Sequence, residues 1–278
     1  MSIYARRYGS YDGPIEPESS RILVIAETEV RRLLAMKWVR RLILMAFTPT
    51  VFLAAMLYFG LVVKKAAGFD PFSGDIFVYH FRTATWFVAV MMAAFGAAMI
   101  AKDVVTRAFP LYFTRPVSIR SYVLGKLAAI AVPVLGVSLL PGVLLAITQW
   151  ALAEDLSLLT AGVTLAKIMG ASVVLAGFAS TVILLMSSLG TSARYVGVGW
   201  LGLFLFLDIA YGIFKAAMGT DSPLLDLMSL RQQLYDVYDL IFRGDSDGIP
   251  ALVSLCAITG FCAAALRVRI LAIEAKNR

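Results

Sequence analysis

Six long apolar blocks constrain this chain more than any other feature of its sequence. A helix needs about 20 apolar residues to cross the roughly 30 Å hydrocarbon layer of a bilayer. Barrel strands are about half as long and alternate in polarity, so blocks of this length indicate helices. The sequence therefore predicts an all-α integral membrane protein. Its six transmembrane helices are predicted at about 42–63, 83–101, 122–152, 166–189, 195–214 and 249–266.

The charges are few, and their distribution predicts an orientation. Only 15% of the 278 residues are charged, and 60% are hydrophobic, whereas soluble proteins average about 25% charged. With both termini in the cytoplasm, 18 of the 25 Lys and Arg residues lie inside. Because cytoplasmic segments are enriched in Lys and Arg, we expect this orientation. The net charge of +7 then reflects membrane orientation and lipid contact, not binding to nucleic acid.

The chain before the first apolar block divides into two parts. Residues 1–20 are polar and lack periodicity, which predicts a flexible cytoplasmic tail, and residues 21–278 form a single transmembrane domain. Residues 21–41 place apolar side chains at helical spacing, which predicts an amphipathic helix in the headgroup layer. Trp38, Arg40 and Arg41 would anchor it at the interface. The alternative is a soluble helix that packs on a partner.

Several classes of enzyme lack their usual residues in this chain. The only histidine, His80, is predicted to be a surface residue of an external loop at 64–82, and two cysteines in the last apolar block do not suggest a metal site. Gly125-Lys126 is not a phosphate-binding loop, because the upstream glycine is missing and Leu127 replaces the required Ser or Thr. We therefore expect no catalytic site, metal site or cofactor in this chain.

Two features of the apolar blocks carry functional alternatives. Asp208 lies within the fifth block, where an acid is expensive to bury, which makes it a candidate for substrate or ion passage. It also lies near the external end, and no second buried charge is evident to form a proton relay with it. In the second block, Ala93, Ala97 and Ala101 recur every four residues. Such small residues allow close helix contact, either within the chain or between subunits.

The segment between the fifth and sixth blocks is predicted to be amphipathic. Ser222-Pro223 is a typical helix start, and apolar residues then recur at helical spacing through residues 222–243. We expect this external segment to lie at the outer face, half in the membrane.

The interval 102–126, KDVVTRAFPLYFTRPVSIRSYVLGK, is the most patterned of the connections. It is basic, carries aromatic residues between its charges, and is divided by Pro110 and Pro116. Surfaces rich in arginine and aromatic residues are favoured at protein interfaces. We expect this loop to bind a cytoplasmic partner, although Arg115 and Arg120 also suit simple anchoring at the membrane.

These features together resemble the permease subunits of type-2, exporter-like ABC transporters. ETEVRRLLAMKWVRR is similar to the N-terminal elbow helix of that family. The loop is similar to the family's cytoplasmic loop, in which an R-P-V-S-like stretch is followed by G-K at the start of the third span. The external amphipathic segment matches the short outer helices of the family. The resemblance covers roughly residues 20–275.

The resemblance implies a homodimer of permease subunits in the bacterial inner membrane, bound by two copies of a separate ATPase subunit that holds ATP and Mg. Other readings remain: a membrane scaffold or sensor that binds a cytoplasmic partner through the same loop, or an ion-coupled carrier. The residues that the resemblance places in or beside the coupling helix of the loop are Arg115, Pro116, Val117, Ser118, Arg120 and Tyr122.

Overall fold

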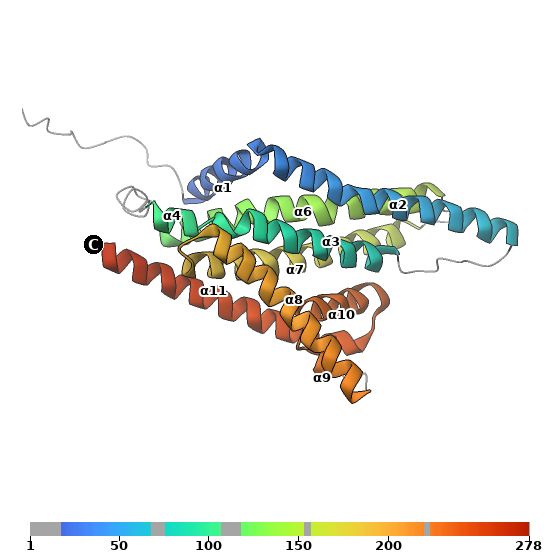
Figure 1. Ribbon diagram of the computed structural model, residues 1–278. Helices are drawn as coiled ribbons and strands as arrows, with labels where there is room; N and C mark the ends of the chain where they lie inside the picture. Colours follow the sequence, from blue (N-terminus) through green and yellow to red (C-terminus); the bar gives the residue numbers. More distant parts are fainter. Residues whose placement is uncertain (1–17, 68–75, 107–117, 153–156, 220–222, 278) are drawn as a thin grey trace, which may run out of the picture.

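The structure is a computed structural model that describes residues 18–67, 76–106, 118–152, 157–219 and 223–277. All regular structure within these ranges is helical (Figure 1), as the sequence predicts. The helices are α1 (Glu18–Ala35), α2 (Lys37–Ala67), α3 (Ile76–Ala94), η1 (Gly96–Ala98), α4 (Ala101–Val105), α6 (Ile119–Leu152), α7 (Leu158–Leu189), α8 (Ala193–Met218), α9 (Pro223–Asp226), α10 (Leu230–Arg243), η2 (Ser246–Gly248) and α11 (Ile249–Asn277).

Six helical segments of the described chain are long and apolar enough to cross a membrane, which confirms the predicted number. Each overlaps one of the predicted blocks, and most extend beyond it because helices continue into flanking polar residues. The segments are Lys37–Gly60, Ile76–Val105, Ile119–Leu152, Leu158–Leu189, Ala193–Met218 and Ser246–Ile273.

The second segment begins well before the predicted residue 83. Helix α3 starts at Ile76, so His80 and Arg82 are helical rather than part of a loop. His80 is only 2% exposed, and the prediction that it is a surface residue is wrong. Hydropathy alone placed the start of the block too late, because these polar residues form hydrogen bonds and ion pairs with neighbouring helices rather than with water.

The same segment contains a break that the sequence did not predict. Helix α3 ends at Ala94, and a 3-10 turn, η1, precedes the short helix α4. The Ser187 hydroxyl on α7 accepts hydrogen bonds from the backbone N–H groups of Ile100 and Ala101, both at 2.9 Å, and donates to the Ala97 carbonyl at 2.8 Å. One side chain thus satisfies backbone groups that the break leaves unpaired.

The predicted amphipathic helix at 21–41 is two helices. Helix α1 ends at Ala35, the chain bends at Met36, and α2 begins at Lys37. Leu33 and Val39 on either side of the bend are buried, at 5% and 0% exposed. In a single straight helix, the period of about 3.6 residues per turn would decide which way each of these two side chains points. The bend lets α1 and α2 each direct its own apolar face toward the bundle.

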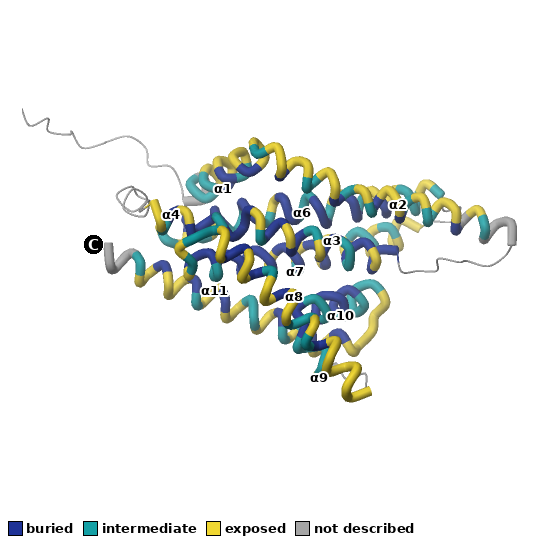
Figure 2. The backbone as a smooth tube through the Cα atoms, viewed as in Figure 1, coloured by how far each residue is buried: buried dark blue, intermediate teal, exposed yellow. Residues whose placement is uncertain are grey.

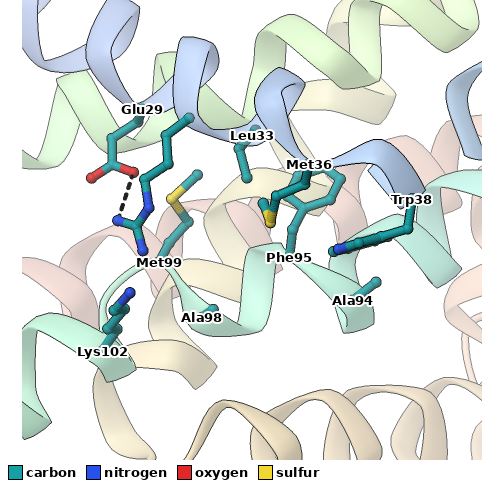
Figure 3. Close-up of a pocket in the computed structure, with 10 residues that line it drawn as sticks. Glu29, Leu33, Met36, Trp38, Ala94, Phe95, Ala98, Met99 and Lys102 are labelled. Carbon is teal, nitrogen blue, oxygen red and sulfur yellow. Dashed lines mark ion pairs between the residues drawn. The ribbon is translucent and has the colours of Figure 1, made fainter. Parts of the chain in front are cut away.

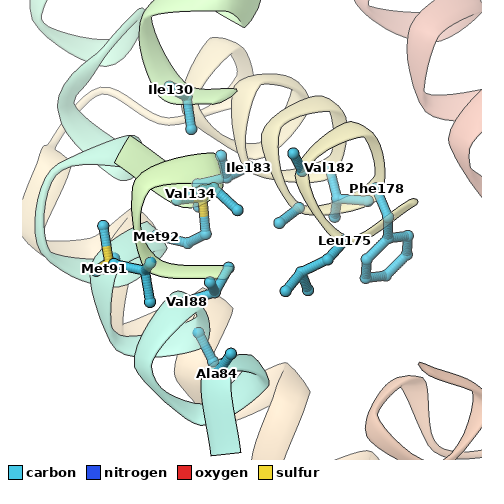
Figure 4. Close-up of a cluster of buried hydrophobic side chains, with 14 of the residues drawn as sticks. Ala84, Val88, Met91, Met92, Ile130, Val134, Leu175, Phe178, Val182 and Ile183 are labelled. Carbon is cyan, nitrogen blue, oxygen red and sulfur yellow. The ribbon is translucent and has the colours of Figure 1, made fainter. Parts of the chain in front are cut away.

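Helices α3 and α7 form the centre of the bundle. In their most apolar stretches 67% of the residues are buried, against 17% for α2 and 28% for α8. Figure 2 shows this as dark central tubes and yellow peripheral ones. The central packing joins Met91 and Met92 of α3 to Val134 of α6 and Ile183 of α7 (Figure 4). The peripheral helices keep apolar faces directed outward, as helices in lipid do.

The small residues of the second segment serve packing within the chain. A Cβ atom added at Gly197 of α8 would lie 2.4 Å from the Ala93 carbonyl oxygen of α3. The two helix backbones therefore touch at this point, which only glycine permits. Ala97 is fully buried and bonds to α7 through Ser187. Intrachain contacts thus account for Ala93 and Ala97.

The described chain has two distinct ends. One end carries α1, α4 and the first turn of α6, with the C-terminus nearby, and we call it the loop end (Figure 1). The opposite end carries α9 and α10, which fall within the predicted external segment 222–243. The apolar face of α10 is covered by protein, with Leu234, Val237 and Tyr238 at most 1% exposed. This face is therefore directed at the bundle, and the position of the segment at the outer face, half in the membrane, stays a prediction.

Candidate functional site

A buried ion cluster lies at the loop end, where α1, α4 and α6 meet. The ammonium group of Lys126, on α6, is 2.7 Å from Glu29 Oε1 of α1 and 2.9 Å from Asp103 Oδ2 of α4. It also donates to the Met99 carbonyl at 3.1 Å. We call Glu29, Asp103, Tyr122 and Lys126 the Lys126 cluster. The side chain of Lys126 is 1% exposed, so these contacts replace water entirely.

Burial makes each charge of the cluster depend on the others. Removing a charge from water costs several kcal/mol, which an ion pair offsets only with good geometry and full hydrogen bonding. Lys126 has three partners for its three N–H donors. The second negative charge is balanced in part by Arg32, whose guanidinium lies 3.6 Å from Glu29 Oε2. Removing any one of these charges would therefore leave another buried charge without its partner.

Tyr122 links the two ends of the loop through a hydrogen bond. Its hydroxyl donates to Asp103 Oδ2 at 2.7 Å, and its ring lies 5.6 Å from the Lys126 ammonium. The side chain is fully buried. Asp103 lies near the start of the loop 102–126 and Tyr122 near its end, so this bond fixes the distance between the two ends of the loop.

Helix α1 lies directly on α6 beside the cluster. A Cβ atom at Gly125 would lie 2.7 Å from Ile25 Cγ2 and 3.3 Å from the Ile22 carbonyl oxygen. The G-K pair of the sequence is therefore structural: the glycine admits α1, and the lysine binds its carboxylate. The sequence marks this pair as part of the family resemblance and excludes a phosphate-binding loop there. It does not predict the ion pairs of Lys126, because Glu29 and Asp103 lie on other helices.

Only some of the predicted partner-binding residues lie within the described part of the chain. Arg115, Pro116 and Val117 lie outside the described residues. Ser118 and Arg120 are exposed, and Tyr122 is buried.

The resemblance implies a coupling helix in or beside these residues. In the described part, α6 begins at Ile119 and continues without interruption to Leu152. The Ser118 hydroxyl accepts from the Ser121 backbone N–H at 3.1 Å, which is the geometry of an N-terminal cap. Residues 119–122 are thus the first turn of the spanning helix. A push on this turn would move α6 directly.

The predicted interfacial anchors Trp38, Arg40 and Arg41 lie in the first turns of α2 and are exposed. Trp38 is 42% exposed, with its ring beside the bend at Met36 (Figure 3). Their role as membrane anchors remains a prediction.

Asp208 has a basic partner at the opposite end of the bundle. Its Oδ1 atom is 2.8 Å from Arg231 Nε and 3.1 Å from Ser229 Oγ, and both donate to it. The Arg231 guanidinium also lies 5.5 Å from the Trp86 ring and 4.9 Å from the Tyr235 ring. This arrangement fastens α10 to α8 and α3. The sequence did not pair Asp208 and Arg231 because no local pattern joins residues on separate helices. A role for Asp208 in a pathway stays a prediction.

The ion pair between Asp208 and Arg231 predicts energetic coupling. We expect Asp208→Ala and Arg231→Ala each to lower the free energy of unfolding, since each leaves a partly buried group unpaired. In a double-mutant cycle the coupling energy should be about 1–2 kcal/mol. Chemical unfolding of the four purified proteins in detergent measures it. Strictly additive effects of the two substitutions would show that the pair contributes nothing.

A second group of contacts fastens α10 to α3. Asp239 Oδ2 is 2.6 Å from Arg82, and the Arg82 guanidinium lies 5.0 Å from the Tyr235 ring. The Tyr238 hydroxyl is 2.9 Å from Thr85 Oγ1. Helix α10 is therefore attached at two places along its length, which makes it part of the bundle and not a mobile cover.

Asp236 on α10 gives this end a pH dependence. Burial, with a further contribution from the charge of Asp226, raises the pKa of Asp236 to about 6. Its ordinary value is about 3.9. The folded protein therefore binds more protons than the unfolded chain between about pH 4 and pH 6, so stability falls as the pH rises through this window.

We expect Asp236→Asn to raise the thermal midpoint at pH 7.5 and to have little effect at pH 4.5. The amide keeps the acceptor for the Gln232 hydrogen bond without the charge. The gain should be under about 1 kcal/mol because the side chain is partly exposed to solvent. Thermal unfolding at the two pH values measures the difference, and an equal effect at both would contradict the assignment.

His80 links three helices within the bundle. Its Nε2 atom is 2.9 Å from the Ser138 carbonyl oxygen of α6. A carbonyl only accepts, so Nε2 carries the proton. The Thr50 hydroxyl of α2 lies 3.4 Å from Nδ1. His80 is thus a structural polar link between α2, α3 and α6.

The described residues contain no group of three His, Cys, Asp or Glu side chains arranged to hold a metal ion. In comparisons with known proteins, no family model matches this chain. No curated protein is significantly similar to it either.

Proposed function

We propose that this chain is the membrane-spanning permease subunit of an ATP-binding-cassette exporter. In this proposal the loop end faces the cytoplasm, where the loop 102–126 binds a separate ATPase subunit. Two permease chains and two ATPase subunits assemble in the bacterial inner membrane. The charge distribution supports this orientation, because the loop end holds most of the Lys and Arg residues.

The Lys126 cluster is the observation that carries the proposal. A transporter driven from outside its own chain needs a loop that passes force to the spanning helices. Asp103 and Tyr122 join the two ends of the loop at 2.7 Å, and Lys126 joins both to α1 through Glu29 at 2.7 Å. A partner that displaces the loop would therefore move α1, α4 and α6 as one unit, which suits rigid-body switching between two states.

ATP and Mg belong to the partner subunit in this proposal. The chain carries no phosphate-binding loop, because Leu127 follows Gly125-Lys126 where a Ser or Thr is required. The structure supports a different use for this lysine, since its ammonium is engaged by two carboxylates. Energy for transport would then come from nucleotide hydrolysed outside the membrane domain.

Association with an ATPase tests the proposal. The tagged full-length chain would be purified from its native membranes, and the bound proteins identified by mass spectrometry, with ATP hydrolysis measured on the purified complex. We expect a subunit with a phosphate-binding loop in equal amount with the chain. Arg115→Glu with Arg120→Glu should release it, because an acidic loop end would oppose a contact made by arginines.

Arg267→Glu with Arg269→Glu is the matched control, since it makes the same charge change on exposed residues of α11. Retention of the ATPase by the Arg115 and Arg120 variant, with the protein still folded, would overturn the role of the loop. A stoichiometric partner without a nucleotide site would instead favour the scaffold or sensor function.

A further inference from the structure

A pocket lies beside the Lys126 cluster, beneath the bend between α1 and α2. Its cavity volume is about 160 Å³, which is close to the roughly 150 Å³ that accommodates a benzene-sized ligand. Figure 3 shows α1 and the first turn of α2 on one side and the end of α3 with η1 and α4 on the other. The pocket is lined by Glu29, Arg32, Leu33, Met36, Trp38, Ala94, Phe95, Ala98, Met99 and Lys102.

The pocket has an apolar floor and a basic mouth. Leu33, Phe95 and Met99 are each at most 5% exposed and form the floor. Arg32 and Lys102 are exposed and lie on opposite walls, one on α1 and one on α4. The Lys102 side chain rises from α4 toward α1 in Figure 3. The combination suits a molecule with an anionic head and an apolar body.

The charges of the pocket leave a positive surplus. Glu29 is the only carboxylate among its lining residues, and its Oε1 atom is occupied by Lys126 at 2.7 Å. Its Oε2 atom is 3.6 Å from Arg32, a distance at which the attraction is weak in a solvated position. Lys102 forms no ion pair within the described part of the chain. With the adjacent Asp103 included, the three cations Arg32, Lys102 and Lys126 outnumber the carboxylates of Glu29 and Asp103 by one. An anion at the mouth would therefore meet a net positive charge.

We propose that this pocket binds an anionic phospholipid. The lipid phosphate lies between Arg32 and Lys102, and the first part of one acyl chain fills the apolar floor. The remainder of the lipid lies outside the pocket, because the cavity is too small for a whole chain. Helix α2 begins at the pocket and exposes large apolar side chains such as Leu44 and Met45, 69% and 61% exposed. The pocket thus opens beside a surface that suits lipid, which favours a membrane lipid over a soluble phosphate.

This site does not depend on the proposed transport function. It follows from the fold of α1 against α4 and would persist in a scaffold protein with the same loop. Bound lipid would bridge α1 and α4 next to the Lys126 cluster. It would stabilise the folded chain, and the stabilisation would be larger for a lipid that binds more tightly.

Native mass spectrometry of the full-length chain in detergent tests the site. The protein would be titrated separately with phosphatidylglycerol, phosphatidylcholine and soluble glycerol phosphate. We expect one phosphatidylglycerol to bind more tightly than phosphatidylcholine. Arg32→Gln with Lys102→Gln should weaken that binding by about fivefold for each cation removed. Ala98→Leu, which keeps both cations and fills the pocket, should weaken binding of both lipids.

The matched control is Arg267→Gln with Arg269→Gln, which removes two exposed cations of α11 and should leave tight binding intact. Equal loss in the control and in the pocket variant would show a general attraction of anionic lipid to a basic surface and would overturn the site. Unchanged binding in the pocket variant would overturn it as well. If glycerol phosphate bound as tightly as the lipid, this would contradict the proposed contact between the acyl chain and the apolar floor. Gel filtration confirms that each variant is folded.

Discussion

Replacing Lys126 by methionine should lower the free energy of unfolding by about 3–5 kcal/mol. Methionine has nearly the same length, so the loss arises from charge rather than from space. Glu29 and Asp103 would be left close together without their shared cation, and they are 9% and 7% exposed. Removing one partner of a buried ion pair costs more than the pair contributes, because the remaining charge is desolvated and unpaired. Chemical unfolding of the purified protein in detergent measures the effect.

Two further variants distinguish the effect of the lost charge on the free energy of unfolding from other effects of the substitution. Lys37→Met makes the same substitution at an exposed lysine on α2 and should change stability by less than about 0.5 kcal/mol. Adding Glu29→Gln and Asp103→Asn to Lys126→Met should recover a large part of the loss, since no buried charge then remains unpaired. A Lys126→Met protein as stable as the parent would show that the cluster does not hold α1, α4 and α6 together.

Gly197→Ala should also be strongly destabilising, by about 3 kcal/mol, which is the upper part of the range for overpacking. The added Cβ atom would lie 2.4 Å from the Ala93 carbonyl oxygen. The obstacle is backbone, which cannot rotate away as a side chain can. Helices α3 and α8 would have to separate, and Trp200 of α8, which donates to the Ala89 carbonyl at 2.9 Å, would lose its hydrogen bond. Thermal and chemical unfolding in detergent measure the change.

Gly199→Ala is the matched control two residues away on the same helix. Its nearest neighbour would be Met186 Cε at 3.9 Å, an ordinary contact. Alanine favours helix over glycine by up to about 1 kcal/mol, so this variant should be neutral or slightly stabilised. If Gly197→Ala behaves like Gly199→Ala, the close contact between α3 and α8 is wrong.

The number and class of the spanning helices could be predicted from the sequence because hydropathy is a local property. A block of apolar residues near 20 in length has few structural options in a bilayer. The break near Gly96 could not be predicted, since it is stabilised by Ser187, 87 residues from Ile100. The bend at Met36 was missed for a related reason: a continuous apolar periodicity does not reveal where two helices change direction.

The candidate site was predicted less well than the fold. The interval 102–126 drew attention through its charges and aromatic residues, and the structure places the Lys126 cluster at its ends. Composition could not separate Lys126, 1% exposed, from the exposed Lys102, because both read as basic loop residues. Similarly, the sequence did not predict the ion pair between Asp208 and Arg231, and it placed His80 at the surface. In each case the missing information is a contact between helices that are distant in sequence.

Crosslinking from position 120 tests the central claim most directly. A photoreactive amino acid would replace Arg120, which is exposed in the first turn of α6, and Ser246, which is exposed at the α10 end, would serve as the control position. Irradiation of native membranes should join position 120, and not position 246, to an ATP-hydrolysing subunit. A crosslink from position 120 to a protein without a nucleotide site, or the absence of any protein crosslink there, would contradict the proposal that this chain is driven by an ATPase.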